Sequence, residues 1–436
     1  MGDRGVCRLW RGERREHLPF LLRGRGGAWL RAPAGKGRRE ADEANKPAEV
    51  EAIEAFLFSQ AEFRHNVITH HCEIRWTEEA GFLPLTDRDV NTLWGRMNKT
   101  VGRVYLTDIY NVIHSEFVPL FNPFQSYFDH LPSWDGVSDP IGDLADTVHV
   151  KSDQAEFRDY FRKWFVGILP ALLDDTVVNH EILVLIGEQG LYKTTWFNFL
   201  LPPELRCYFY TKTNSDRLNK DDLFSLTEFA LICFEELDGM RPAELNQLKA
   251  MVTMPYVNER AAYGRNKERH PHIASFCGTG NNVQFLTDPT GNRRWLPFEV
   301  SQIRDPHLHA IPYELVYSQA YALWKSGFCH WFSQEEIRKL NMHNSRFEVP
   351  NLEEDLIRTH FRKPFEGEAG IFVTAADILE QISSCLRYPL SPNKIGRIMA
   401  GLEFESIRYK GKRGYIAVKK TGEDIDRERR SGALGL

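Results

Sequence analysis

The sequence predicts an α/β protein, and three observations lead to that prediction. Residues 182–186 form an apolar run, ILVLI, of the kind found in strands that are buried on both faces. A glycine-containing loop and an aromatic-rich helix start follow directly, at 187–200. Further apolar runs at 229–234 and 273–277 repeat the strand pattern later in the chain. Strands that alternate with helices in this way indicate an α/β sheet.

The composition is that of a globular protein, which excludes fibrous, wholly disordered and membrane-spanning classes. Of 436 residues, 42% are hydrophobic, 12% are aromatic and 26% are charged. No apolar run approaches the ~20 residues that a bilayer span needs. The seven cysteines are scattered without a CxxC pair. We therefore expect a reducing compartment and cytoplasmic localisation.

The first 47 residues differ in composition from the rest. Residues 1–39 contain ten arginines and one lysine against three acids, a net charge of +8, so the remainder carries −13 of the total of −5. We expect residues 1–47 to form a basic flexible tail. This segment could be an arm that binds nucleic acid. The alternative is a disordered leader or a wrongly assigned start codon. Because the remainder is acidic, nucleic-acid binding must come from local basic elements.

Between this tail and the apolar strand the pattern is mainly helical. The expected elements, in order, are a helix over 49–63, strands over 63–76, helices that begin at the caps Thr86 and Thr107, an aromatic packed connector over 121–139, and a long helix over 153–173. The cluster His70, His71 and Cys72 suggests a metal site. Adjacent histidines alternate faces of a strand, however, and no partner cluster is evident, so we favour a structural role.

The loop after the first apolar strand is the first candidate site, and it reads GEQGLYKTT. It matches G-x-x-x-x-G-K-[ST] at Gly187, Lys193 and Thr194, with Tyr192 in place of the second glycine. In such loops backbone N–H groups wrap phosphates, the lysine reaches the β- and γ-phosphates, and the hydroxyl ligates Mg²⁺. A glycine-containing turn with an incidental lysine is the alternative. The residues that we expect to bind ATP are Gly187, Glu188, Gln189, Gly190, Lys193, Thr194 and Thr195.

Polar side chains follow the next apolar runs. Glu235 and Glu236 come directly after the run at 229–234, and Asn281 lies just beyond the run at 273–277. A phosphate-cleaving site needs one acid near the metal and another that orients the attacking water, at the carboxyl end of a neighbouring strand. We expect Thr194 and Glu235 to hold Mg²⁺, Glu236 to orient water and Asn281 to contact the γ-phosphate. Solvated acids at a strand end are the alternative.

Two arginines follow, Arg293 and Arg294, in the segment GNRRWLPF. Guanidinium groups stabilise the charge that develops on a transferred phosphoryl group. Surface ion pairs are the alternative function for these two side chains.

The ordered series GEQGLYKTT, LICFEELD, FCGTGNN and DPTGNRRWLPF resembles the virulence-associated protein E family of bacteria and their phages and plasmids. Members are superfamily 3 helicase-like P-loop ATPases of the AAA+ kind. The upstream blocks FNPFQSYFDHLPSWDG and LTDRD resemble that family too, so the resemblance covers about residues 50–300. It implies Lys193 and Thr194 as Walker A residues, Glu235 and Glu236 as Walker B residues, Asn281 as sensor, and Arg293 or Arg294 as a finger acting on the neighbouring subunit. Tyr192 departs from the Walker pattern.

The predicted fold class is therefore α/β: a P-loop AAA+ type ATPase core with a helical N-terminal domain and a C-terminal winged-helix-like domain. The expected parts are a basic tail (1–47), a mainly helical N-terminal domain (48–150), the ATPase core (151–310), a helical connector (311–365), a winged-helix-like domain (366–420) and a charged tail (421–436).

Two basic segments are candidates for DNA contact. The first, 258–272, is a predicted hairpin between strands, and the resemblance implies that such a hairpin moves DNA; a solvated loop is the alternative. The second is in the C-terminal region, where helices capped by Thr374 and Ser391 precede a strand, basic turn and strand over 406–419. A protein–protein module of the same fold is the alternative there. The candidate DNA contacts are Arg260, Arg265, Lys267, Arg269, Lys394, Arg397, Lys410, Lys412 and Arg413.

We therefore expect an Mg²⁺-dependent ATP hydrolase that acts on DNA, single-stranded DNA above all, as a ring-forming helicase or translocase of a mobile genetic element. A homo-oligomer, such as a hexameric ring, and no membrane partner are part of this prediction. The alternatives are an ATP-gated DNA-binding regulator that does not unwind, and a degenerate nucleotide binder that serves as a scaffold.

Overall fold

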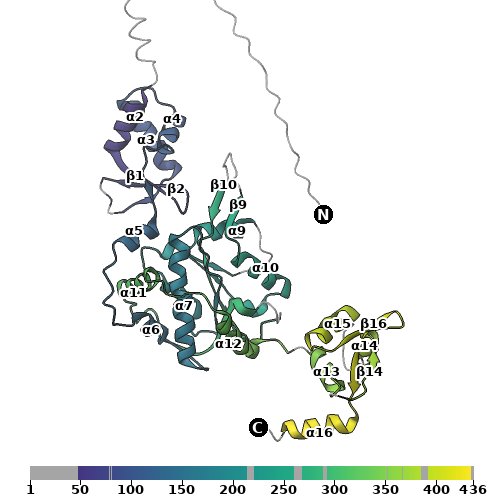
Figure 1. The fold of residues 1–436 in the computed structure, drawn as a ribbon. Helices are drawn as coiled ribbons and strands as arrows, with labels where there is room; N and C mark the ends of the chain where they lie inside the picture. Colours follow the sequence, from purple (N-terminus) through teal and green to yellow (C-terminus); the bar gives the residue numbers. More distant parts are fainter. Residues whose placement is uncertain are drawn as a thin grey trace, which may run out of the picture. The chain divides into compact units, whose positions relative to one another are not determined.

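A computed structural model describes residues 48–433, with gaps at 78, 80, 214–219, 260–267, 288–291, 351, 366 and 384–390. The chain forms two compact units (Figure 1): one contains residues 48–64 and 72–119, the other 65–71 and everything from 120 onward. The architecture is mixed α/β, as predicted. The predicted tail over 1–47 lies outside the described residues, as do Arg260, Arg265 and Lys267. Among the described helices, none is both long enough and apolar enough to cross a bilayer.

The first unit is built from three helices on a small sheet. Its elements are α2 (Val50–Gln60), most of β1 (Ala61–Asn66) and of β2 (His71–Trp76), β3 (Leu83–Pro84), α3 (Asp87–Thr100) and α4 (Leu106–Ile113). Thr86 caps α3 as predicted, because its hydroxyl accepts from Asp89 N while the Asp89 carboxylate accepts from Thr86 N. The start predicted at Thr107 is wrong. The helix α4 begins at Leu106 because the Asp108 carboxylate accepts from Tyr105 N at 3.1 Å.

The metal cluster considered at His70, His71 and Cys72 does not form a common pocket. Cys72 points into the core of the first unit and its sulfur donates to Ile113 O, whereas both histidines are exposed. No group of three or more His, Cys, Asp or Glu side chains in the described part of the chain is arranged to hold a metal ion.

The second unit is organised around a six-stranded sheet with the order β5-β12-β6-β11-β8-β7. Five strands are parallel, and β5 runs antiparallel to β12. The strands are β5 (Val148–Val150), β6 (Ile182–Ile186), β7 (Phe209–Lys212), β8 (Leu231–Phe234), β11 (Ser275–Gly280) and β12 (Trp295–Ile303). From β6 the chain goes to the far edge at β7 and returns through β8 and β11. The carboxyl end of β6 thus lies where the connections diverge, and ligands of open α/β sheets bind at such points.

Helices cover both faces of this sheet, and α7 runs along one of them (Figure 1). On β6, Leu183 and Leu185 belong to the core that contains α7, whereas Ile182, Val184 and Ile186 belong to the opposite core, which contains α10. Two-sided burial explains why β6 is a continuous apolar run. The helices are α5 (Pro123–Asp129), α6 (Pro140–Ala145), α7 (Gln154–Leu173), α8 (Lys193–Leu200), α9 (Lys220–Glu228), α10 (Pro242–Val252), α11 (Tyr313–Lys325) and α12 (Gln334–Asn344).

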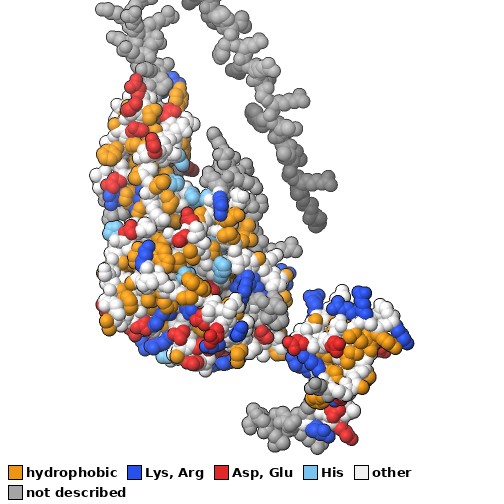
Figure 2. Space-filling model, viewed as in Figure 1, with side chains coloured by type: hydrophobic (Ala, Val, Ile, Leu, Met, Phe, Trp, Pro, Cys, Tyr) orange, Lys and Arg blue, Asp and Glu red, His pale blue; other side chains and the backbone are white. Residues whose placement is uncertain are grey.

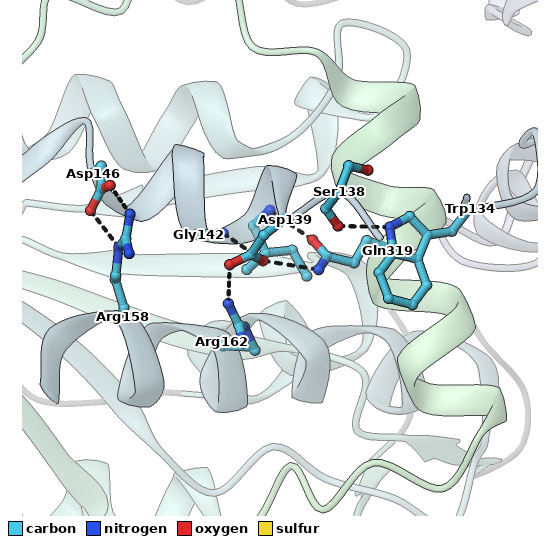
Figure 3. Close-up of polar contacts among 9 residues, drawn as sticks. Trp134, Ser138, Asp139, Gly142, Asp146, Arg158, Arg162 and Gln319 are labelled. Atoms are coloured by element: carbon cyan, nitrogen blue, oxygen red, sulfur yellow. Dashed lines mark hydrogen bonds and ion pairs between the residues drawn. The ribbon is translucent and has the colours of Figure 1, made fainter. Parts of the chain in front are cut away.

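Asp139, at the end of the predicted connector, ties three of these helices together (Figure 3). Its carboxylate caps α6 by accepting from Gly142 N, accepts from Gln319 Nε2 of α11 at 2.9 Å, and pairs with Arg162 of α7. The same Gln319 accepts from Ile141 N through Oε1 at 2.8 Å. The connector also contains α5, a helix that the sequence pattern did not predict and that begins at an Asn122 cap.

The remaining part of the chain has a core of its own. Its elements are α13 (Leu352–His360), β13 (Phe361–Arg362), β14 (Ile371–Val373), α14 (Ala375–Ser383), α15 (Pro392–Gly401), β15 (Ser406–Tyr409), β16 (Lys412–Lys419) and α16 (Gly422–Ala433). The caps at Thr374 and Ser391 are confirmed by bonds from Asp377 N and Lys394 N. Lys410 and Gly411, both with positive φ, form the two-residue turn between β15 and β16. The last helix, α16, occupies the segment expected to be a charged tail.

Candidate functional site

The loop between β6 and α8 is held tightly against its neighbours. Gly187 N donates to Gly280 O of β11 at 3.1 Å. A Cβ on Gly187 would lie 2.9 Å from Val300 O of β12, so no larger residue fits there without a shift. Gly190 has φ +89°. The loop therefore turns sharply at the carboxyl end of β6, with glycine at both of these constrained positions.

Tyr192, the residue that departs from the glycine pattern, occupies the left-handed region with φ 60° and ψ 17°. A residue with a Cβ is strained there by about 1–2 kcal/mol relative to the right-handed region. The backbone thus has a conformation that suits glycine. The helix α8 begins at the next residue, so the first N–H groups of Lys193, Thr194 and Thr195 have no intrahelical acceptor.

Lys193 is 8% exposed, and its ammonium group lies inside the loop. Nζ donates to Gly187 O at 2.6 Å and to Glu188 O at 2.7 Å, and approaches Asn281 Oδ1 at 3.4 Å. Burial lowers the pKa of Lys193 from its ordinary value, and the charge of Asp238 acts in the opposite direction. The lysine is therefore a desolvated cation surrounded by neutral oxygen acceptors.

Thr194 and Glu235 form the second contact of the site. Thr194 Oγ1 donates to Glu235 Oε1 at 2.8 Å, which joins the first turn of α8 to the end of β8. Glu235 N in turn donates to Lys212 O at the end of β7. Glu236 follows with φ 55°, a second strained residue. The Thr194 hydroxyl and the Glu235 carboxylate, which we expected to hold one ion together, therefore lie in direct contact.

These side chains line one cavity of ≈ 470 Å³ at the carboxyl edge of the sheet, a size typical of small-molecule sites. Its lining is Gln189, Gly190, Leu191, Tyr192, Lys193, Thr194, Thr195, Glu235, Glu236, Thr279, Gly280 and Asn281. The segments that converge follow β6, β8 and β11, which are separated by 40 or more residues in the sequence.

Arg293 and Arg294 lie elsewhere. They directly precede β12, whose first residue Trp295 pairs with Ile182 at the start of β6, whereas the loop follows Ile186 at its end. Five strand residues span about 13 Å, so both arginines are at the opposite, amino edge of the sheet. They line a separate cavity of ≈ 180 Å³ with Glu181 and four other residues, and burial raises the pKa of Glu181 to about 7.

Asp238 is a residue of the site that the sequence reasoning missed. It lies in the short helix η2 (Leu237–Gly239) after the two glutamates, and its carboxylate accepts from Asn281 N, Asn282 N and Asn282 Nδ2. The available signal was the acid in LICFEELD, but nothing in the local pattern places it beside FCGTGNN.

The comparison with family models decides the assignment. The model of the virulence-associated protein E-like domain matches residues 129–349, half of the chain. The chain belongs to the virulence-associated protein E-like family. Its matched region contains the loop, both glutamates, the Asn281 turn and both arginines. No curated protein matches this family member.

Solved structures give weaker matches to this virulence-associated protein E-like chain. An apo structure of the NrS-1 C-terminal region (305–718) shares 12% identity with a TM-score of 0.46, and covers 85% of this chain and 99% of that one. An A-form apo structure of the same region shares 13% identity with a TM-score of 0.44 and the same coverage.

The candidate DNA contacts fall in two places. The hairpin consists of β9 (Tyr256–Glu259) and β10 (Glu268–Pro271), paired antiparallel as predicted, and the Arg269 guanidinium lies 3.7 Å from the centre of the Tyr256 ring. In the C-terminal part, Lys394 is paired with the buried Glu353 of α13, which ties its charge to the fold.

The other C-terminal candidates are exposed: Arg397, Lys410, Lys412 and Arg413. Figure 2 shows Lys and Arg side chains gathered along the edge of this part near α15 and β16. The exposed charges thus lie on α15, on the turn residue Lys410 and on the first two residues of β16, within the helix and the hairpin singled out from the sequence.

Proposed function

We propose that this protein is an Mg²⁺-dependent ATPase that acts on DNA as a ring-forming helicase or translocase of a mobile genetic element. One observation carries the proposal: Lys193, Thr194, Glu235 and Asn281, from three separate segments, line a single cavity at the carboxyl edge of a parallel sheet. A phosphate loop followed by a helix, with an acid from a neighbouring strand, is the arrangement that phosphoryl transfer requires.

The residues present fit both ATP and Mg²⁺. Lys193 Nζ and the N–H groups at the start of α8, which have no intrahelical acceptor, are donors for phosphate oxygens, and the bound phosphate would replace the loop carbonyls that Nζ contacts. Thr194 Oγ1 and Glu235 Oε1 are oxygen ligands of the kind that Mg²⁺ takes. The metal, when bound, would neutralise charge on the phosphates. Glu236 would orient the attacking water, and Asn281 would contact the γ-phosphate.

The positions of Arg293 and Arg294 support a finger that acts between subunits. Since these arginines and the loop lie at opposite edges of the sheet, neither arginine can complete the site of its own chain. A head-to-tail arrangement would bring the amino edge of one subunit to the carboxyl edge of the next, and such heterologous contacts form a ring where the rotation between subunits closes. Removal of a finger costs ~10³–10⁵ in rate in other phosphoryl-transfer systems.

The order of elements in the C-terminal part supports a winged-helix-like domain. After α13 and the short strand β13, it runs strand, helix, helix and hairpin: β14, α14, α15 and β15–β16. We propose that the exposed cations on α15 and the hairpin turn contact DNA phosphates, and that Arg269 with Tyr256 forms a second contact. An ATP-gated DNA-binding regulator is the second candidate function, since a basic edge of this kind would also serve binding without unwinding.

A mixing experiment tests the proposed subunit arrangement. K193A and R293A/R294A are expected to hydrolyse ATP at least ~100-fold more slowly than wild type when each is alone. Mixed in equal amounts, they should recover activity, because some interfaces then combine an intact loop with an intact finger. No recovery in the mixture, with both variants folded, would contradict a finger supplied by the neighbour.

A labelled forked duplex distinguishes the two candidate functions. ATP-dependent strand separation by wild type, absent from K193A, supports the helicase. DNA-stimulated ATP hydrolysis without strand separation would favour the regulator.

A further inference from the structure

Asp238 joins the loop that contains the two glutamates to the turn that contains the sensor. Oδ1 accepts from Asn281 N at 3.1 Å, and Oδ2 accepts from Asn282 N at 3.1 Å and from Asn282 Nδ2 at 2.7 Å. Both carboxylate oxygens are therefore used, and all three donors belong to one turn. Hydrogen bonds to a charged acceptor are about twice as strong as neutral ones.

The end of β11 is shaped to admit this contact. A Cβ on Gly278 would lie 2.2 Å from Leu237 Cδ1, and a Cβ on Gly280 would lie 3.1 Å from Asp238 Oδ1. Leu237 is buried and occupies the space above Gly278, which fixes η2 against the strand. The two glycines of FCGTGNN thus let η2 approach closely enough for Asp238 to reach the backbone of the turn.

We infer that Asp238 is a positioning residue that holds Asn281 toward the cavity, so that the site distinguishes a nucleoside triphosphate from a diphosphate. The inference rests on the proposed function. Asn281 lines the cavity and lies beside the buried ammonium of Lys193. The Asn281 N–H donates to Asp238, which fixes the backbone at Asn281 and thereby the direction of its Cα–Cβ bond. The group that would meet the third phosphate is therefore set by the loop that also contains Glu235 and Glu236.

Asp238→Asn is the informative substitution because it keeps the size of the side chain. An amide has one acceptor oxygen, so its NH₂ group must face either Asn281 N or the donors of Asn282, and at least one N–H loses its partner. The loss of one such bond weakens binding that depends on the turn by about tenfold. Removal of the Asp238 charge, which also acts on Lys193, affects the binding of both nucleotides, so the ratio of the two affinities is the quantity that reports on the turn.

The measurement is binding of fluorescently labelled ADP and of a labelled non-hydrolysable ATP analogue, with Mg²⁺, to the full-length chain. D238N is expected to lower the ratio of ATP-analogue affinity to ADP affinity about tenfold. N282A is the matched control: it removes only the side-chain bond and leaves both backbone bonds, so the ratio should stay as in wild type. N281A should lower the ratio as D238N does, and the double variant should lower it no further.

The outcomes separate the inference from the proposed function. A wild type that binds neither nucleotide overturns the proposed function itself. Three results overturn the positioning role when wild type binds both nucleotides. The affinity ratio is unchanged in D238N, or D238N loses the same affinity for both nucleotides, or the losses of D238N and N281A add in the double variant. If D238N does not fold, D238E serves instead, because it keeps both acceptors but moves them by one methylene. A lowered ratio in D238E supports the inference, and an unchanged one overturns it.

Discussion

The strained backbone at Tyr192 gives the sharpest prediction about the loop. The comparison is between Tyr192→Gly and Tyr192→Ala, because both remove the ring and only alanine keeps a Cβ at φ 60°. Relief of left-handed strain favours glycine by about 1–2 kcal/mol. The greater freedom of glycine in the unfolded chain offsets about 0.5–1 kcal/mol of this. Y192G should therefore be more stable than Y192A, by about 0.75 kcal/mol at the middle of these ranges and by about 1.5 kcal/mol at most.

Urea denaturation followed by tryptophan fluorescence measures this difference, since Trp196 lies in the helix that Tyr192 precedes. Equal slopes of the two transitions would show that the midpoint shift reports stability alone. Y192A as stable as Y192G, or more so, would refute the argument, because the loop would then not hold this residue in the left-handed region.

Two further predictions concern stability and pH. Burial lowers the pKa of His272 to about 4, while its Nδ1 lies 2.6 Å from Met254 O. The unfolded chain therefore binds more protons than the folded one between about pH 6.5 and 4, and stability falls as the pH decreases through that window. Between neutral pH and pH 5, the free energy of unfolding should fall by about 2 kcal/mol more for wild type than for H272N, which keeps a donor at the Nδ1 position. If urea titrations gave the same pH dependence of this free energy for both proteins, the argument would be contradicted. For the contacts in Figure 3, D139A should cost about 2–3 kcal/mol because a helix cap, Gln319 and Arg162 all lose a partner. D146A, which removes only the half-exposed pair with Arg158, should cost less than about 1 kcal/mol, and equal thermal shifts for the two would contradict the assignment.

The sequence patterns predicted those strands and helices that are determined by residues close together in the sequence. The strand Ile182–Ile186 has the predicted bounds because both faces are buried, so every residue in it is apolar. The long helix predicted over 153–173 lies at Gln154–Leu173, one residue later at its start because Asp153 is the cap. By contrast, the strand expected over 273–277 lies at Ser275–Gly280. Gly278 and Gly280 near its end face Leu237 and Asp238 of η2, and no local pattern shows a contact between segments so far apart in the sequence.

The residues of the candidate site also divide into those that a local pattern predicts and those that depend on distant contacts. Lys193 and Thr194 could be predicted because the loop motif is contiguous, and Glu235 because it follows an apolar run. Asp238 could not, since its role depends on the order of strands across the sheet. That order also places Arg293 at the far edge from the loop, which no spacing in the sequence indicates.

The most direct test of the central claim is the steady-state rate of ATP hydrolysis by wild type and K193A, with Mg²⁺ and single-stranded DNA, at several protein concentrations. We predict hydrolysis by wild type that requires Mg²⁺ and rises steeply with protein concentration. K193A should be slower by at least ~100-fold while unfolding at a similar urea concentration. A folded K193A that hydrolyses ATP as fast as wild type would contradict the assignment of the site.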